Sequence, residues 1–186
     1  MRLFVAIELT EPVRAALAKL QSTLRPQCGG VRWVPPGNLH VTVKFLGEVP
    51  DQKVMGVTQA VERAASRASR FSMSVAQAGC FPLRGPVRIV WAGVQETPES
   101  LTRCVEAIEE EMEVLGFARE RRPFSAHITI GRVANDRSGG VIREAVESST
   151  FPPVEQEATA ITLMSSTLSA RGAEYAAASR AALAGV

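Results

Sequence analysis

The first half of the chain follows two hydrophobic periodicities in turn. Apolar residues that alternate with polar ones indicate a strand, whereas apolar residues three or four positions apart indicate a helix. By this rule we predict strands at 2–8, 31–34, 39–46 and 70–78. One helix is predicted from Thr10, as its N-cap, to Leu24, and a second helix over 51–69.

The second half repeats this order. Strands are predicted at 87–93 and 124–133, with an amphipathic helix at 98–115 between them, then a helix at 141–147 and a β-rich stretch at 154–169. In the first half 36 residues separate Phe4 from His40, and in the second half 37 residues separate Val90 from His127. A strand, a helix and a histidine-bearing strand at matched spacing indicate an internal duplication. We therefore predict an α+β fold of two lobes related by a pseudo-two-fold axis.

The domain organisation follows from the same pattern. A chain of 186 residues is long enough to bury a core of its own. No linker separates the two halves, so residues 1–186 are expected to form a single domain of two similar lobes rather than two independent domains.

The only two histidines begin matching tetrads of the form His-apolar-Thr-apolar, HVTV at His40 and HITI at His127. In a strand, residues i and i+2 point to the same face, so each histidine shares a face with Thr42 or Thr129. Imidazole can move a proton near neutral pH, and a hydroxyl can donate to an anionic oxygen. Two such faces across a cleft supply the acid, the base and the donors that phosphodiester cleavage needs.

The main alternatives for the histidines are a structural role and a metal site. A single histidine on an alternating strand is usually structural, but two matching tetrads arise by chance on the order of once in ten thousand such sequences. Two histidines cannot complete a zinc site, which needs three or four protein ligands, so neither a metal nor another cofactor is expected. The isolated cysteines, which are expected to be buried and unreactive, are Cys28, Cys80 and Cys104.

Charge and hydropathy add little to this picture. The net charge of +2 permits an anionic partner without requiring one, and arginine supplies most of the positive charge. The first residues do not form a secretory signal, and no apolar run approaches the roughly 20 residues of a membrane span. A cytoplasmic monomer that does not bind membranes is expected.

Three segments carry a family resemblance: RLFVAIEL, VRWVPPGNLHVTVKFLGEV and RPFSAHITIGR. On these segments the sequence resembles the two-histidine (2H) phosphoesterases, and within them the RNA 2′,3′-cyclic phosphodiesterases, also called 2′-5′ RNA ligases. The resemblance runs over nearly the whole chain. It implies a bilobal fold, with an antiparallel sheet and helices in each lobe and an active cleft between them. The closing run AAASRAAL departs from the more apolar, patterned ending expected of the family, which puts the final strand in doubt but not the chemistry.

The resemblance also implies a reaction. The enzyme would open the 2′,3′-cyclic phosphate at an RNA 3′ end, for example of a tRNA-like fragment, and leave a 2′-phosphate. His40 would be the proton donor to the departing 3′ oxygen, and His127 the proton acceptor that activates water. Thr42 and Thr129 would hold the non-bridging oxygens, and Arg132 would meet the phosphate. Joining the cyclic end to a 5′-hydroxyl would use the same histidines with their roles exchanged.

Several alternatives stay open. The chain could be a non-catalytic nucleotide- or RNA-binding module that kept the cleft, or a 2H enzyme for another small cyclic phosphate. Arg132 could equally be a solvated residue at a strand end. Lys44 shares the predicted strand face of His40 and could add positive charge. Trp33 and Phe81 could stack on a base, although packing in the core is the more common role for such residues.

Overall fold

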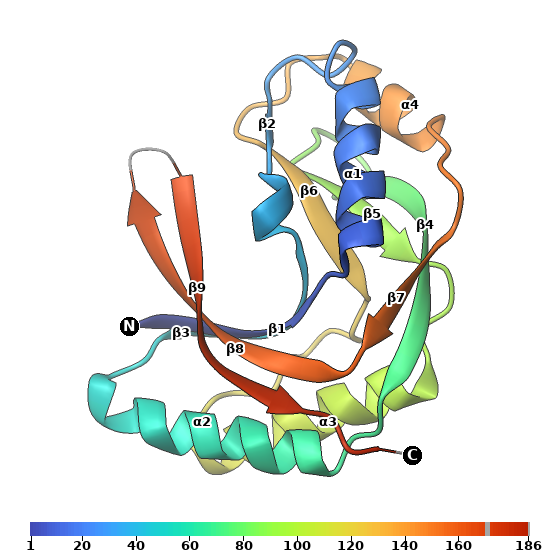
Figure 1. The fold of residues 1–186 in the computed structure, drawn as a ribbon. Helices are drawn as coiled ribbons and strands as arrows, with labels where there is room; N and C mark the ends of the chain where they lie inside the picture. The colour runs from blue at the N-terminus through green and yellow to red at the C-terminus, as the bar shows by residue number, and fades with distance from the viewer. Residues whose placement is uncertain (170–171, 186) are drawn as a thin grey trace.

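The computed structural model describes residues 1–169 and 172–185. Its strands are β1 (Arg2–Glu8), β2 (Val31–Trp33), β3 (His40–Glu48), β4 (Phe71–Phe81), β5 (Ile89–Val94), β6 (His127–Val133), β7 (Val154–Ala158), β8 (Ala160–Ser169) and β9 (Gly172–Ala182) (Figure 1). Its helices are α1 (Glu11–Leu24), α2 (Asp51–Ser66), α3 (Glu99–Val114) and α4 (Val141–Glu147), with a short 3-10 helix, η1 (Pro36–Asn38).

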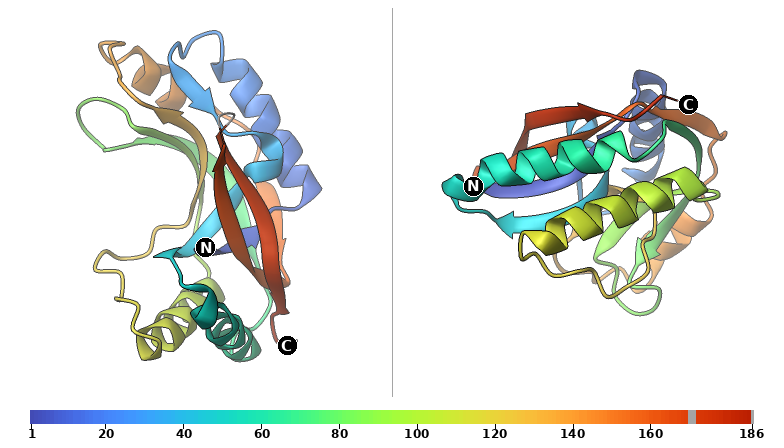
Figure 2. Two further views of the ribbon diagram at one scale, coloured as in Figure 1. Left: turned by 90° about the vertical axis from the view of Figure 1, so that its left-hand side faces the viewer. Right: turned by 90° about the horizontal axis from the view of Figure 1, so that it is seen from below.

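The strands form one curled antiparallel sheet in the order β7-β4-β5-β6-β3-β1-β8-β9, with β2 added beside β6. The two histidine-bearing strands, β3 and β6, are neighbours at its centre. Outside them lie β1 and β5, the strands that begin the two repeats. Helices α2 and α3 run side by side below the sheet, and α1 and α4 lie at the opposite end (Figures 1 and 2). This arrangement confirms the α+β class and the two-lobed expectation.

The core forms where the predicted apolar faces meet. Helix α1 buries Val13, Leu17, Leu20 and Leu24, at the spacing that predicted the helix. In the central strands Val41, Ile128 and Ile130 are fully buried, which holds the backbone of both tetrads rigidly. Each such side chain contributes about 1.5–3 kcal/mol through its removal from water.

The start of α1 is held differently from the prediction. Thr10 occupies the N-cap position, but its side chain makes no capping hydrogen bond. Its backbone N–H instead donates to the side-chain oxygen of the buried Gln156 on β7, at 2.8 Å. The side-chain amide of Gln156 donates in turn to the carbonyl of Glu8, at 3.2 Å. A residue distant in sequence therefore anchors the turn between β1 and α1.

The end of the chain also differs from the prediction. The stretch at 154–169 is two strands, β7 and β8, and the following segment forms β9, which pairs with β8 along its length. The final strand, which the run AAASRAAL put in doubt, is present, and β9 lies at the edge of the sheet. Backbone hydrogen bonds to β8 form there without an alternating apolar pattern, and most of the strand is exposed. Among the described residues, no helix is both long and apolar enough to span a membrane.

Candidate active site

The two tetrads meet at a single pair of residues. Val41 of β3 lies opposite Ile128 of β6 in antiparallel register. One residue further along each strand, this register sets His40 opposite Thr129 and Thr42 opposite His127. The apolar members of both tetrads are buried, whereas the histidines and threonines are half-buried on the opposite face. The four predicted residues are therefore gathered on one face of the sheet, around the pseudo-two-fold axis.

Both imidazole rings are held by the same contact. Nδ1 of His40 lies 2.8 Å from the carbonyl oxygen of Asn38, and Nδ1 of His127 lies 2.8 Å from that of Ser125. A carbonyl oxygen can only accept, so in each ring the hydrogen is assigned to Nδ1. Each Nε2 is then left to accept a proton when the ring is neutral and to donate one when it is charged.

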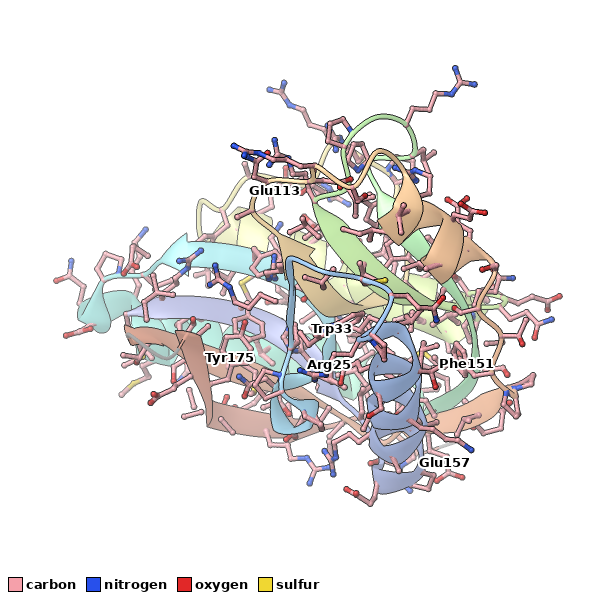
Figure 3. All side chains as sticks on the ribbon, turned by 90° about the horizontal axis from the view of Figure 1, so that it is seen from above. Arg25, Trp33, Glu113, Phe151, Glu157 and Tyr175 are labelled. Carbon is pink, nitrogen blue, oxygen red and sulfur yellow. The ribbon has the colours of Figure 1, made fainter. Side chains whose placement is uncertain are left out.

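Aromatic rings also position both histidines. The His40 ring lies 4.9 Å from Phe4 and 5.3 Å from Tyr175 of β9, which meets it edge to face. His127 meets the ring of Phe81 edge to face, at 5.3 Å. Tyr175 is labelled in Figure 3, which views the molecule from above. The edge strand that the sequence did not predict therefore contributes a wall of the His40 site.

The environment of His40 affects its protonation. Burial lowers the pKa of His40 below the ordinary histidine value, because the charged ring is poorly solvated there. The carbonyl of Asn38 opposes this effect, whereas the nearby Arg132 and His127 lower the pKa further. His40 therefore favours the neutral form in the free protein.

A cleft of about 530 Å³ opens over this face of the sheet. Thr42 and Phe45 of β3 line it, together with His127, Thr129 and Arg132 of β6 and residues of the segment between α3 and β6. That segment and the β4–β5 turn project on the same side of β6 (Figure 2). The half-buried ring of His40 lies on the same face, packed against Phe4 and Tyr175 and within electrostatic reach of Arg132 and His127.

A β-bulge turns Arg132 into the cleft. On β6, Thr129 and Gly131 pair with consecutive residues of β5, so that Ile130 is an extra residue. One extra residue reverses which face the following side chains occupy. Without the bulge, Arg132 would lie on the buried face with Ile128; with it, Arg132 is exposed and lines the cleft. The structure thus places Arg132 beside the other predicted site residues.

Strand β3 carries the same irregularity at the equivalent place. Thr42 and Lys44 pair with consecutive residues of β1, which leaves Val43 extra. The bulge turns Phe45 toward the cleft, where 66% of its surface is exposed. Phe45 was not among the residues predicted from the sequence. Aligning the two tetrads on their histidines would have indicated it, because Phe45 then falls at the position of Arg132.

Lys44 has a different role from the one expected. Its side chain is buried, and Nζ lies 2.6 Å from Oε2 of Glu109 on α3. Nζ also donates to the carbonyl of Ala118, and Oε2 of Glu109 accepts from the backbone N–H of Glu120. The positive charge of Lys44 is therefore matched by Glu109 and is not offered to a ligand. The pair fastens the α3–β6 segment at the edge of the cleft.

The remaining candidates, Trp33 and Phe81, are half-buried. Trp33 lies against the core and faces Gly131, where a side chain would collide with the neighbouring Val31. Phe81 packs against Trp91 as well as His127. Neither aromatic residue matches the exposure of Phe45. Among the residues that the structure describes, His, Cys, Asp and Glu side chains do not gather in threes as a metal ion would require.

The cysteines do not offer a reactive nucleophile. All three are buried free thiols. Burial raises the pKa of Cys80 and of Cys104 to about 11, and it also raises the pKa of Cys28. A thiol with a raised pKa is protonated at neutral pH and is a poor nucleophile.

Known proteins resemble this chain in both sequence and fold. The RNA 2′,3′-cyclic phosphodiesterase of Archaeoglobus fulgidus is 35% identical over 179 residues, which cover 94% of this chain and 96% of that protein. The protein of the same name from Thermotoga maritima is 33% identical over 175 residues, covering 94% and 91%.

Solved structures agree with these relatives. A crystal structure of a Thermus thermophilus protein superposes with a TM-score of 0.83 at 30% identity, covering 100% of this chain and 99% of that one. Escherichia coli LigT complexed with 3′-AMP superposes with a TM-score of 0.76 at 28% identity, covering 98% and 97%. Residues 7–91 and 93–175 match the LigT-like phosphoesterase family, and each matched segment contains one histidine tetrad. The chain therefore belongs to the LigT-like phosphoesterases, the two-histidine family that its sequence resembles.

Proposed function

We propose that this protein hydrolyses 2′,3′-cyclic phosphodiester ends of RNA to 2′-phosphomonoesters by acid–base catalysis that needs no metal. The proposal rests on the pairing of Val41 with Ile128, which places two histidines and two threonines next to each other on one face of the sheet. An acid, a base and two hydroxyl donors around one anion are what this reaction requires. The names of the relatives from Archaeoglobus and Thermotoga support the same substrate.

The proposed reaction proceeds in one displacement at phosphorus. Nε2 of His127 accepts a proton from water, and the water oxygen forms a bond to phosphorus. The bond from phosphorus to the 3′ oxygen breaks, and that oxygen takes a proton from Nε2 of His40. The hydroxyls of Thr42 and Thr129 donate to the non-bridging oxygens, and the guanidinium of Arg132 offsets their charge. The products are a 2′-phosphate and a free 3′-hydroxyl.

The donor role of His40 depends on the substrate. In the free protein, burial and neighbouring positive charge lower the pKa of His40, which favours the neutral ring. A bound phosphodiester places negative charge beside the ring and raises its pKa again. The acid is therefore formed by substrate binding, and a pair with unlike protonation states predicts a bell-shaped pH profile.

Phe45 extends the proposal to the nucleoside. Its ring is exposed on the cleft wall, close to the threonines that would hold the phosphate. An exposed aromatic ring beside a phosphate site is a suitable platform for an unpaired base. We assign this role to Phe45 in preference to Trp33 and Phe81, since both of those rings are half-buried whereas Phe45 is exposed.

We propose that the same site also catalyses the reverse reaction. The reverse reaction, with a 5′-hydroxyl in place of water, would form a 2′-5′ linkage with the histidine roles exchanged. Ends of tRNA-like fragments are suitable substrates for either direction.

We further propose that residues 1–186 act as one domain, in keeping with the continuous sheet, and that the protein works as a cytoplasmic monomer.

One assay tests the reaction. An RNA with a 2′,3′-cyclic phosphate end is incubated with the protein and excess EDTA, and the product end is identified. We expect a 2′-phosphate from the wild type and none from His40→Ala or His127→Ala. Arg70→Ala serves as the control variant. Arg70 is exposed and directly precedes β4, at the end of that strand opposite to Phe81, the residue that contacts His127. Full activity in both histidine variants would overturn the mechanism, and a 3′-phosphate product would reverse which bond is broken.

Two rival functions have distinct outcomes in the same experiment. Another small cyclic phosphate, such as a cyclic nucleotide or ADP-ribose cyclic phosphate, would be hydrolysed faster than the RNA end if it were the enzyme's substrate. A non-catalytic module would bind the RNA end without converting it. The intact histidine and threonine pairs in both tetrads favour hydrolysis.

A further inference from the structure

Two arginines lie directly opposite each other beside the cleft. Arg32 of β2 pairs with Arg132 of β6 in antiparallel register. Side chains at opposed positions point to the same face, with their Cβ atoms about 4.5–5.5 Å apart. Because Arg132 lines the cleft, Arg32 lies on the cleft-facing side, on a strand that pairs directly with β6.

Neither guanidinium has a carboxylate partner among the residues that the structure describes, and both are exposed. Some other surface arginines do have such partners: Arg119, which also lines the cleft, pairs with Glu113 at 3.2 Å, and Arg63 and Arg67 pair with glutamates of α3. Glu113 is labelled in Figure 3. Like charges placed directly across two strands destabilise a sheet. An anion between them would remove this cost.

The chemistry of the pair indicates which anion. A guanidinium is planar and binds phosphate oxygens through two parallel N–H donors. Arg132 faces the position proposed for the reacting phosphate. Arg32 lies one strand spacing of about 4.8 Å from Arg132, and its long side chain extends further. A single RNA strand presents its next phosphate on the 5′ side of the terminal nucleoside.

We infer that Arg32 binds the 5′-phosphate of the terminal nucleotide, so that the enzyme selects RNA ends over free nucleoside cyclic phosphates. This inference rests on the proposed function, since it places the second phosphate relative to the reacting one. It assigns Arg32 a part in substrate selection and none in the proton transfers. Arg32 should therefore act on KM and leave kcat unchanged.

Two substrates that differ by one phosphate provide the kinetic test: adenosine 2′,3′-cyclic phosphate and its 5′-phosphorylated form. For Arg32→Gln we expect KM for the 5′-phosphorylated substrate to rise about tenfold. KM for the substrate with a 5′-hydroxyl should stay unchanged. Arg70→Ala, which removes one exposed positive charge far from the cleft, should alter neither value. Equal effects of Arg32→Gln on both substrates, or no effect on either, would overturn the inference.

A binding measurement separates this inference from the proposed function. A fluorescent oligoribonucleotide that ends in a 2′-phosphate is titrated at several salt concentrations by anisotropy, without any turnover. Loss of one phosphate contact should reduce the slope of log affinity against log salt by about 0.7 in Arg32→Gln. An unchanged slope would overturn the role of Arg32 even if the wild type hydrolyses both substrates. A reduced slope in a protein that hydrolyses neither substrate would support the phosphate contact and reject the proposed reaction.

Discussion

Phe45 and Arg132 occupy equivalent positions in the two lobes, each five residues after a tetrad histidine and each turned into the cleft by a one-residue bulge. The backbone of the duplicated unit is thus the same on both sides, while the side chain at this position has diverged. One lobe presents an aromatic surface and the other a guanidinium. A symmetric cleft can in this way receive an asymmetric ligand, with a base on one side and charged groups on the other.

Phe45→Ala should weaken substrate binding. Stacking of a base on an aromatic ring contributes about 1–3 kcal/mol, so we expect KM for an RNA cyclic phosphate end to rise about tenfold or more. The turnover number should change little, because the ring does not touch the reacting atoms. Steady-state kinetics measure both, and Phe45→Tyr, which keeps the ring, is the matched control. A lower kcat with an unchanged KM would contradict the role of a platform.

The threonines should affect the chemical step instead. Thr42→Val and Thr129→Val remove a hydroxyl at nearly constant volume. Loss of one donor to a charged transition state lowers kcat by about 10²–10³-fold. Thr42→Ser and Thr129→Ser, which keep the hydroxyl, should retain most activity. Single-turnover measurements at saturating substrate would detect the difference, and equal rates for the valine and serine variants would exclude the hydroxyls from catalysis.

His40 should make stability depend on pH. Its pKa in the folded protein is lowered below the ordinary 6.5, so between these two values the unfolded chain holds more protons. The stability that His40 contributes is therefore fully present above about pH 6.5 and is lost as the pH falls through the folded pKa.

Urea unfolding at pH 8 and pH 5 measures this effect. The free energy of unfolding should decrease more between these two pH values in the wild type than in His40→Gln. An equal decrease in both proteins would show that the imidazole titrates normally in the fold. A histidine NMR titration with added inorganic phosphate provides a second check, since a bound anion should raise the pKa of His40.

The buried pair of Lys44 and Glu109 should behave as a unit. Both side chains are almost fully enclosed, at 5% and 10% exposure. Lys44→Met leaves a buried carboxylate without its partner, which should cost about 3–5 kcal/mol in unfolding free energy. The double substitution with Glu109→Gln should recover part of that loss. Chemical denaturation of the two single variants and the double variant measures the coupling, and strictly additive losses would show that the two charges do not interact.

Local sequence was sufficient for the elements that carry the chemistry. His40 and Thr42 share a face because every strand alternates, and the buried apolar residues between and behind them show which face is hidden. The repeated order of strand, helix and strand predicted the two lobes. The family resemblance rested on the same segments, and the comparison with known proteins confirmed it. Each of those features follows from short stretches of sequence and from their order along the chain.

Tertiary structure decided the features that depend on a distant partner. Val43 and Ile130 become bulges only through their pairing with β1 and β5, so alternation alone could not place Phe45 or Arg132. Lys44 alternates like any strand residue, and only the packing of α3 brings Glu109 to it.

The final strand and the arginine pair also depend on partners that are distant in sequence. Backbone pairing with β8 forms β9 and brings Tyr175 to His40, although nothing in the run AAASRAAL indicates a strand. The pairing of β2 with β6 sets Arg32 opposite Arg132. The periodicity of a sequence specifies which face a residue occupies within its own element. The register between elements is set by backbone hydrogen bonds and core packing across the whole chain, and only the folded structure contains it.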